Sequence, residues 1–122
     1  MSIATLERSD ASTAMSFDEI QAFLFAEARA LDDRDWDTWL TFYHQTCPFW
    51  MPAWDDYDTL TEDPQNEMSL MYYPNKQGIE DRVFRIKTDR SSATSLPEPR
   101  TNHYLSGIEV LGRAGSKIRL RF

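Results

Sequence analysis

Apolar residues recur at helical spacing near the start of the chain and define its first predicted helix. The positions that share one helical face are Phe17, Ile20, Leu24, Ala28 and Leu31. Ser16, immediately before them, and Glu19 have the spacing of a capping box, in which each side chain bonds the backbone N–H of the other residue. The pattern predicts an amphipathic helix over residues 17–33.

A second, shorter helix is predicted to follow and to end near Tyr43. Asp35 precedes it, and aspartate is one of the residue types that cap helix N-termini. The inner side of this helix carries Trp36, Trp39, Leu40 and Tyr43. We expect this apolar side to need a partner elsewhere in the fold.

The pattern changes to short extended segments after the helices. Phe49–Met51 is an aromatic strand between two prolines, and Met68–Tyr73 is a second extended run that a proline ends. Basic and apolar residues then alternate over residues 117–122. This alternation predicts a final strand, paired with residues 101–111 through a turn at residues 113–116.

Residues 78–106 hold a basic helix, a two-proline loop and the polar opening of the next strand. Acidic residues come first in the helix and basic residues follow, which is the order that the helix macrodipole favours. One face of the helix carries Ile79, Val83 and Ile86. Pro97 and Pro99 cannot continue a helix, and the sequence leaves the cis or trans state of both X-Pro bonds open.

Helices come first and strands afterwards, which predicts an α+β fold without βαβ units. Residues 1–15 are mostly small and polar, so we expect a flexible N-terminal arm there. Residues 16–122 then form the single domain expected for this length. The last hairpin leaves a long open edge, so we expect the sheet to be truncated at its C-terminal end or completed by another polypeptide.

The composition restricts the classes of function. Apolar residues make up 41% of the chain, which is too many for a disordered protein. The net charge of -7 argues against nucleic-acid binding and against docking on anionic lipid. No apolar run approaches a membrane span, and residues 1–15 lack the pattern of a secretory signal. With Cys47 as the only cysteine, we expect no intramolecular disulfide and a cytoplasmic protein.

The sequence holds little that can bind a catalytic metal. A Rieske cluster needs two Cys and two His, and this chain has one Cys and two His. A mononuclear iron site is arithmetically available from His44, His103 and an acid, but structural histidines are the favoured interpretation because the spacing carries no signature. Cys47 lies three residues after His44, and a small buried residue is favoured over a thiol nucleophile.

An aromatic group lies in the middle of the chain. It comprises Phe49, Trp50, Trp54, Tyr72 and Tyr73. Such side chains line small-molecule pockets, anchor protein interfaces or form an ordinary core. The sequence leaves these three alternatives open.

Four runs of sequence together resemble a known family. They are AEARALDDRDWDTWLTFY over residues 26–43, WMPAWDDYDTLTEDPQ over 50–65, MYYPN over 71–75 and DRVFRIKTDRSSATSLPEPRTNH over 81–103. These runs look like the small, or β, subunit of aromatic-ring-hydroxylating dioxygenases. The likeness covers residues 16–121 and is closest to the branch that acts on benzoate, toluate and 2-halobenzoates.

The resemblance implies an NTF2-like cone, a fold like nuclear transport factor 2, in which N-terminal helices pack on a strongly curved, mostly antiparallel sheet. It implies a subunit without a metal or an active site of its own, in an α3β3 hexamer. The α subunit of that hexamer would carry a Rieske 2Fe-2S cluster and a mononuclear Fe(II), and a separate reductase would supply electrons from NADH. The complex would cis-dihydroxylate benzoate-type acids with O2, in aromatic degradation. Family members continue through further strands, which this chain would lack.

We predict that Trp50, Trp54 and Arg100 contribute to the subunit interface, because aromatic and arginine side chains are frequent interface anchors. A stand-alone enzyme on the same NTF2-like fold, resembling ketosteroid isomerase or scytalone dehydratase, is the alternative. In it, His103 or a buried acid would act as general base. That alternative needs a closed pocket, so the non-catalytic subunit is the favoured interpretation. Which aromatic acid is the substrate is left open.

Overall fold

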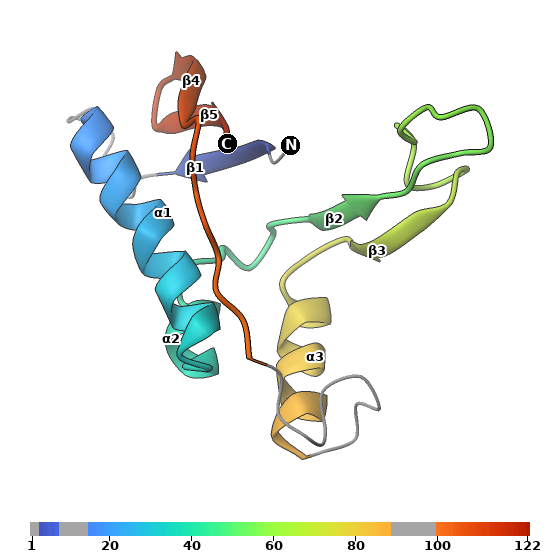
Figure 1. Cartoon of the computed structure of the whole chain (residues 1–122), viewed down its shortest axis with the longest axis horizontal. Coiled ribbons are helices and arrows are strands. Elements are labelled where there is room, and N and C mark those ends of the chain that lie inside the picture. Colours follow the sequence, from blue (N-terminus) through green and yellow to red (C-terminus); the bar gives the residue numbers. More distant parts are fainter. Residues whose placement is uncertain (1–2, 8–14, 89–99) are drawn as a thin grey trace. The chain divides into compact units, whose positions relative to one another are not determined.

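The computed structural model describes residues 3–7, 15–88 and 100–122 of the chain, shown in Figure 1. The chain divides into two compact units. The first unit comprises Met1–Asp35 and Thr101–Phe122, and the second comprises Trp36–Arg100. Pro97 and Pro99 lie outside the described residues, as does the rest of their loop, so the state of their peptide bonds stays open.

The first helix of the first unit is α1 (Phe17–Asp32), which confirms the helix predicted over residues 17–33. The predicted capping box is present at its start. The Glu19 N–H donates to Ser16 Oγ at 3.2 Å, and the Ser16 N–H donates to Glu19 Oε2 at 2.9 Å. Two backbone donors that the helix cannot satisfy internally are therefore bonded, and this fixes where α1 begins.

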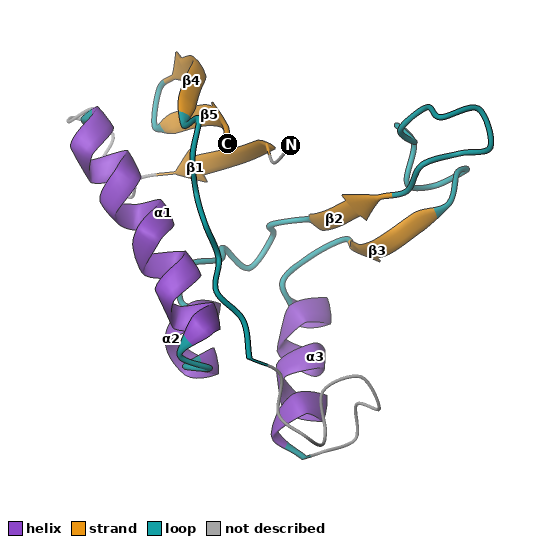
Figure 2. Ribbon diagram, in the orientation of Figure 1, coloured by secondary structure: helices purple, strands orange, loops and turns teal. Residues whose placement is uncertain are grey.

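A three-stranded antiparallel sheet accompanies α1 in the first unit, as the ribbon in Figure 2 shows. Its strands are β1 (Ile3–Glu7), β4 (Glu109–Ala114) and β5 (Lys117–Arg121), in the order β1-β5-β4. The turn between β4 and β5 contains Gly115 at a φ of 60°, a left-handed conformation that glycine adopts without strain. The predicted C-terminal hairpin is thus confirmed.

Strand β1 corrects the expectation of a flexible arm in its Ile3–Glu7 part. These residues pair with β5 position by position, from Ile3 opposite Arg121 to Glu7 opposite Lys117. Leu6 is buried in the core of the unit. The edge of β5 that the sequence was expected to leave open is therefore covered by a strand of the same chain.

The prediction of a strand over residues 101–111 is wrong in its first part, because β4 begins only at Glu109. Two features explain the late start. The backbone N–H of His103 bonds a side chain in α1 instead of a neighbouring strand. Gly107 has a φ of 65°, which takes the backbone out of the extended conformation.

The core of the first unit lies between α1 and the sheet. Its buried members are Leu6, Ile20, Leu24, Ile118 and Leu120. Strand β5 alternates as predicted: its apolar side chains are buried, while Lys117, Arg119 and Arg121 are exposed. A helix packed on an antiparallel sheet that has one wet face is the arrangement expected of an α+β fold.

The second unit begins with α2 (Trp36–Leu40), which is shorter than the helix predicted to reach Tyr43. The next three backbone N–H groups bond the carbonyls three residues earlier, at 3.0 to 3.3 Å, so the chain tightens into turns after Leu40. The aromatic side of the segment is used as expected. Trp39 is buried and makes edge contacts with the rings of Tyr43 and Phe49.

The second unit continues with a hairpin of β2 (Phe49–Pro52) and β3 (Ser69–Tyr73), which confirms both predicted strands. The strands are antiparallel, with Phe49 opposite Tyr73 and Met51 opposite Met71. The register shifts before Pro52, where the chain leaves the ladder and enters the loop that joins the strands. This two-stranded sheet presents several of the residues discussed below.

Helix α3 (Gln77–Lys87) follows β3 and confirms the predicted amphipathic helix over its described part. Ile79 and Val83 are buried. Gly78 lies in the first turn of α3, against the side chain of Tyr73, where a Cβ at position 78 would overlap both the ring and Tyr73 Cβ. Only glycine fits this close approach between the end of β3 and the start of α3.

Candidate functional site

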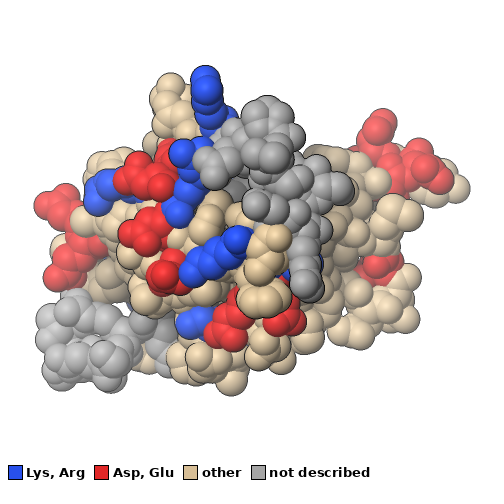
Figure 3. Space-filling model, turned by 90° about the horizontal axis from the view of Figure 1, so that it is seen from below, with Lys and Arg blue, Asp and Glu red and all other residues tan. Residues whose placement is uncertain are grey.

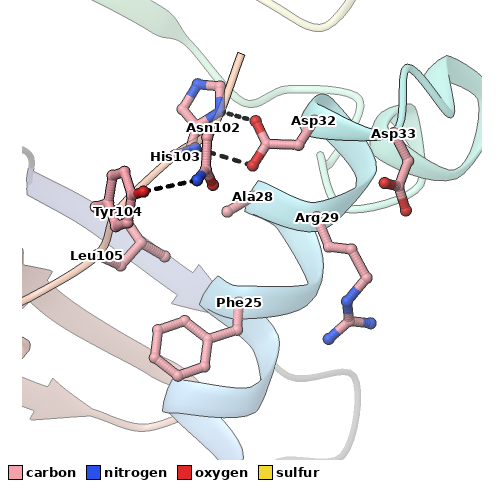
Figure 4. A pocket seen from close by; sticks show the side chains of 9 residues that line it. All are labelled: Phe25, Ala28, Arg29, Asp32, Asp33, Asn102, His103, Tyr104 and Leu105. Carbon is pink, nitrogen blue, oxygen red and sulfur yellow. Dashed lines mark hydrogen bonds and ion pairs between the residues drawn. The ribbon is translucent and has the colours of Figure 1, made fainter. Parts of the chain in front are cut away.

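The side chain of Asp32, in the last turn of α1, holds the extended segment that leads to β4 (Figure 4). Its carboxylate accepts the backbone N–H of His103 at 2.9 Å and the Thr101 hydroxyl at 3.0 Å. The ring Nδ1 of His103 lies 2.5 Å from Oδ1 of the same Asp32 carboxylate. These bonds join two segments that are far apart in the sequence but belong to the same unit.

The same contacts set the charge of Asp32. The backbone N–H of His103 contributes most to a lowered pKa of the Asp32 carboxyl, and the His103 ring and the Thr101 hydroxyl lower this pKa further. Hydrogen bonds to the ionised form favour that form. Asp32 therefore stays a carboxylate at neutral pH and acts as a fixed acceptor for the segment.

A shallow cavity of about 520 Å³ borders this contact, and both polar and apolar side chains line it. Phe25, Ala28 and Leu105 supply apolar surface. Figure 4 shows Asn102 and Tyr104 on the same extended segment, with the Asn102 amide donating to the Tyr104 hydroxyl at 2.8 Å. The cavity is open to solvent, because both of these residues and His103 are exposed.

A carboxylate that orients an imidazole is the arrangement of many general bases. Here, however, the carboxylate of Asp32 also bonds the backbone of the same histidine, and the ring is open to solvent. The Tyr104 hydroxyl nearby is already bonded to Asn102. The geometry is that of an anchor between α1 and the segment 101–103. Sequence reasoning picked out His103 but missed Asp32, which no local motif marks.

The predicted interface residues fall in different environments. Trp50 is half-buried in β2, and its Nε1–H donates to Ser69 Oγ across the hairpin at 2.8 Å. Trp54 follows the strand and is 70% exposed. Arg100 is exposed and forms no hydrogen bond or ion pair with another described residue. The structure thus brings the two tryptophans to one hairpin, and no contact within the described ranges ties Arg100 to them.

The hairpin and its loop expose more large apolar side chains than sequence reasoning singled out. We call this set the hairpin surface; it consists of Met51, Trp54, Tyr57, Met68 and Leu70. Met51, Met68 and Leu70 were missed because a strand pattern does not reveal which side stays uncovered, and Tyr57 was missed because it lies in the loop between the strands. A signal was present nonetheless, since residues 35–75 contain no Lys or Arg.

The loop of the hairpin is held by polar groups. The Thr61 side chain is 5% exposed and bridges the two sides of the loop. Its Oγ1 accepts the Ala53 N–H at 3.0 Å and donates to the Met68 carbonyl at 2.9 Å. Asp55 Oδ1 accepts the N–H groups of Tyr57 and Thr59 at 2.8 and 2.9 Å, in an Asx-turn.

The two remaining candidates for chemistry are His44 and Cys47, and the side chain of each contacts a residue one or two positions along the chain. His44 Nδ1 lies 2.9 Å from Thr46 Oγ1, and the Cys47 thiol donates to the Pro48 carbonyl at 3.3 Å. Burial raises the pKa of the Cys47 thiol, which disfavours the reactive thiolate.

The described part of the chain contains no group of three or more His, Cys, Asp or Glu side chains placed to hold a metal ion. One Cys and two His also do not fit the ligand set of a Rieske cluster, so no catalytic step is assigned to one on this chain. In the same described ranges, no helix has both the length and the apolar character that crossing a bilayer requires.

Residues 26–121 match the model of the ring hydroxylating beta subunit family, and the chain belongs to that family. It is 59% identical over 108 residues to benzoate 1,2-dioxygenase subunit beta of Acinetobacter baylyi, a match that covers 88% of this chain and 63% of the relative. It is 52% identical over 108 residues to toluate 1,2-dioxygenase subunit beta of Pseudomonas putida, covering 88% of this chain and 66% of the relative.

A solved structure is also similar. The crystal structure of the beta subunit of benzoate 1,2-dioxygenase from Burkholderia mallei has 48% sequence identity and a TM-score of 0.68, over 84% of this chain and 61% of that one. The resemblance and the predicted α+β fold are thereby confirmed. The chain spans less than two thirds of the length of the relatives it matches.

Proposed function

We propose that this chain is the non-catalytic β subunit of a multicomponent ring-hydroxylating dioxygenase that cis-dihydroxylates benzoate-type aromatic carboxylates with O2 and NADH. The catalytic large subunit carries the Rieske cluster and the mononuclear iron, and a separate reductase delivers the electrons. The β subunit supports an α3β3 hexamer in the cytoplasm. Its own contribution is to hold the large subunits in place.

The observation that carries this proposal is the 59% identity with benzoate 1,2-dioxygenase subunit beta over 88% of the chain. Toluate and 2-halobenzoate dioxygenase small subunits at 52% and 51% identity support the same class of aromatic acids. Anthranilate 1,2-dioxygenase small subunit is more distant, at 35% identity. This ranking favours benzoate and its substituted forms as the substrate of the assembled enzyme.

The proposal extends to the contact residues. Trp50, Trp54 and Arg100 contribute to contacts between subunits, because Trp and Arg are the side chains most enriched at the centres of interfaces. Support comes from Trp54, a large apolar side chain that is 70% exposed. Trp50 acts indirectly, because its bond to Ser69 fixes the hairpin on which Trp54 is presented.

Co-expression with the cognate large subunit tests the proposal. The expected product is a stoichiometric complex that contains iron and, with reductase, NADH and O2, converts benzoate to the cis-dihydrodiol carboxylate. The chain purified alone is expected to bind no iron and to convert nothing. Turnover by the chain alone with added Fe(II), or the absence of any complex with the large subunit, would overturn the proposal.

The contact residues have their own test. Trp54→Ala and Arg100→Ala should each lower the yield of the complex, with Arg85→Ala, an exposed arginine on α3, as the control. Equal yields for all three variants would count against the contact residues without touching the family assignment.

The Asp32–His103 contact offers a test against an isomerase-like enzyme. His103→Gln keeps a hydrogen-bonding side chain but removes the imidazole. In a subunit that only supports the complex, turnover per assembled complex should be unchanged. A general base at this position predicts loss of turnover by several orders of magnitude, with assembly intact.

A further inference from the structure

We propose that the hairpin surface docks into an apolar recess of the large subunit that is rimmed by Lys and Arg side chains. The inference rests on the proposed function and goes beyond it by stating the chemistry of the partner's surface. Three features of the second unit carry it: the exposure of the apolar side chains, the polar fastening of the loop that presents them, and the one-sided charge around them.

The exposure is large and concentrated. Tyr57 is 87% exposed, and Met68 and Leu70 are each 76% exposed, all within one hairpin and its loop. Exposed apolar side chains scattered singly over a protein need no explanation, but a cluster of them marks an interaction site. Trp, Tyr and Met are also residue types that are enriched at protein interfaces. The hairpin surface therefore has the composition of a docking site.

The loop that carries this surface is ordered without being buried. The Thr61 hydroxyl is hydrogen-bonded to the backbone of both Ala53 and Met68, and the Thr61 N–H donates to the Ala53 carbonyl at 2.8 Å. The Asx-turn at Asp55 shapes the backbone on either side of Tyr57. These bonds use backbone and polar groups and leave the apolar side chains free to contact a partner. A surface that is already shaped loses little conformational entropy on binding, which favours tight association.

The charge around the hairpin surface has a single sign. The acidic residues of the loop are Asp55, Asp56, Asp58, Glu62, Asp63 and Glu67. Bonds from the Asn66 side chain and the Gln65 N–H lower the pKa of Asp63 and keep it charged. The side chains of Asp56, Asp58 and Glu62 form no hydrogen bond or ion pair with another described residue.

The sequence supplies no countercharge nearby, since Lys and Arg are missing from residues 35–75. On the face drawn in Figure 3, the end that carries the β2–β3 loop shows acidic side chains without basic ones among them. Desolvating these carboxylates against a neutral or acidic surface would be unfavourable. Charge complementarity therefore selects a partner with a basic rim around the apolar recess. The large subunit is the partner that the proposed function provides.

The first experiment compares two aromatic truncations in the full chain, co-expressed with the cognate large subunit. Tyr57→Ala removes an exposed ring whose side chain makes no hydrogen bond with a described residue. Phe84→Ala removes a ring that is 59% exposed on α3, outside the hairpin surface, and is the matched control. Tyr57→Ala should weaken binding of the large subunit about tenfold or more, while Phe84→Ala leaves it unchanged.

The second experiment tests the charge. Asp56→Asn with Asp58→Asn removes two loop charges, and Asn is suited to position 58, where φ is 56°. The double variant should bind the large subunit more weakly at low salt and flatten the salt dependence. Asp18→Asn with Glu109→Gln makes the same change of net charge away from the loop and should keep the wild-type salt dependence.

The outcomes are distinguishable. If the wild-type chain does not assemble with the large subunit, the proposed function fails; if it assembles and Tyr57→Ala binds equally well, only the docking inference fails. Self-association of the chain alone that Tyr57→Ala abolishes would assign the surface to a second copy and overturn the inference. Unaltered urea midpoints establish that the variants fold. Leu70→Thr is a second variant that removes an apolar side chain from the hairpin surface, and threonine still favours the strand conformation of β3.

Discussion

The two sheets of this protein differ in the exposure of their apolar side chains. In the first unit, β5 turns Ile118 and Leu120 toward α1 and leaves its basic residues in water. In the second unit, the β2–β3 hairpin keeps Met68 and Leu70 largely exposed, and its loop is fastened by the hydroxyl of Thr61. The first sheet is held by burial, and the loop of the second is held by hydrogen bonds.

This difference separates a sheet that stabilises its own unit from one that presents a surface. Apolar side chains that have no stabilising contact within the chain carry a cost in solubility, which a protein bears where a partner covers them. Order in such a region has to come from another source, and buried polar bonds supply it. The following predictions test each side of the comparison, beginning with the largest expected effect.

Leu120→Ala should have the largest effect on stability, because Leu120 is fully buried at the centre of the first unit. Removing its side chain leaves a cavity, and such changes cost about 2–5 kcal/mol. Urea denaturation followed by circular dichroism measures the loss. The control is Arg119→Ala, an exposed neighbour on the same strand, which should change stability by less than about 0.5 kcal/mol. Similar losses for both would contradict a unit held by burial.

Gly78→Ala should destabilise the second unit at the junction of β3 and α3. The added Cβ meets the Cβ and the ring of Tyr73, which lie too near the backbone to swing away. Overpacking of this kind costs about 1–3 kcal/mol. Gly112→Ala in β4 is the control, because nothing lies within 4 Å of the added atom there. A thermal melt that moves equally for both variants would argue against the close approach.

Thr61→Val keeps the shape of the side chain but removes the hydroxyl that fastens the loop. The Ala53 N–H and the Met68 carbonyl then lose their partner, and we expect a loss of about 1–3 kcal/mol. Hydrogen exchange at residues 53–68 should accelerate while that of the first unit stays constant. Thr59→Val, on the exposed part of the loop, is the control. Unchanged exchange in Thr61→Val would mean that burial, not polar bonding, orders the loop.

Asp32→Asn should have the smallest effect, and the effect should depend on pH. Because the pKa of Asp32 is lowered in the folded chain, its carboxylate stabilises the fold above the unfolded pKa of about 3.9. This contribution is lost as the pH falls through the folded pKa. The melting temperature of the variant should lie a few degrees below wild type at pH 7, and the gap should close below about pH 4. A gap that is the same at both pH values would contradict the role of the carboxylate.

The sequence predicts those parts of the fold whose signals are local. The capping box of Ser16 and Glu19, the alternation of β5 and the amphipathic face of α3 all appear in the structure as expected. Each depends on residues within a few positions of one another, so helical or strand periodicity is sufficient to find them.

What the sequence did not predict depends on contacts between distant residues. Strand β1 is too short to show a clear strand pattern, and it pairs along its whole length with β5 at the other end of the chain. The segment after Thr101 has strand-forming residues, yet Asp32 takes the N–H of His103. Within the hairpin, Trp50 and Trp54 were selected by residue type alone, and only the structure separates the half-buried one from the exposed one.

The division of the chain has a consequence for how it folds. The second unit is continuous in sequence, whereas the first is formed by two segments that Trp36–Arg100 separates. Pairing of β1 with β5 must therefore close a long loop, and such non-local contacts are slow to form. We expect the second unit to fold first and thereby to shorten the loop that joins β1 to β5. Until then, β1 stays unpaired. Changes in the second unit should consequently slow the folding of the first, even where they leave its stability untouched.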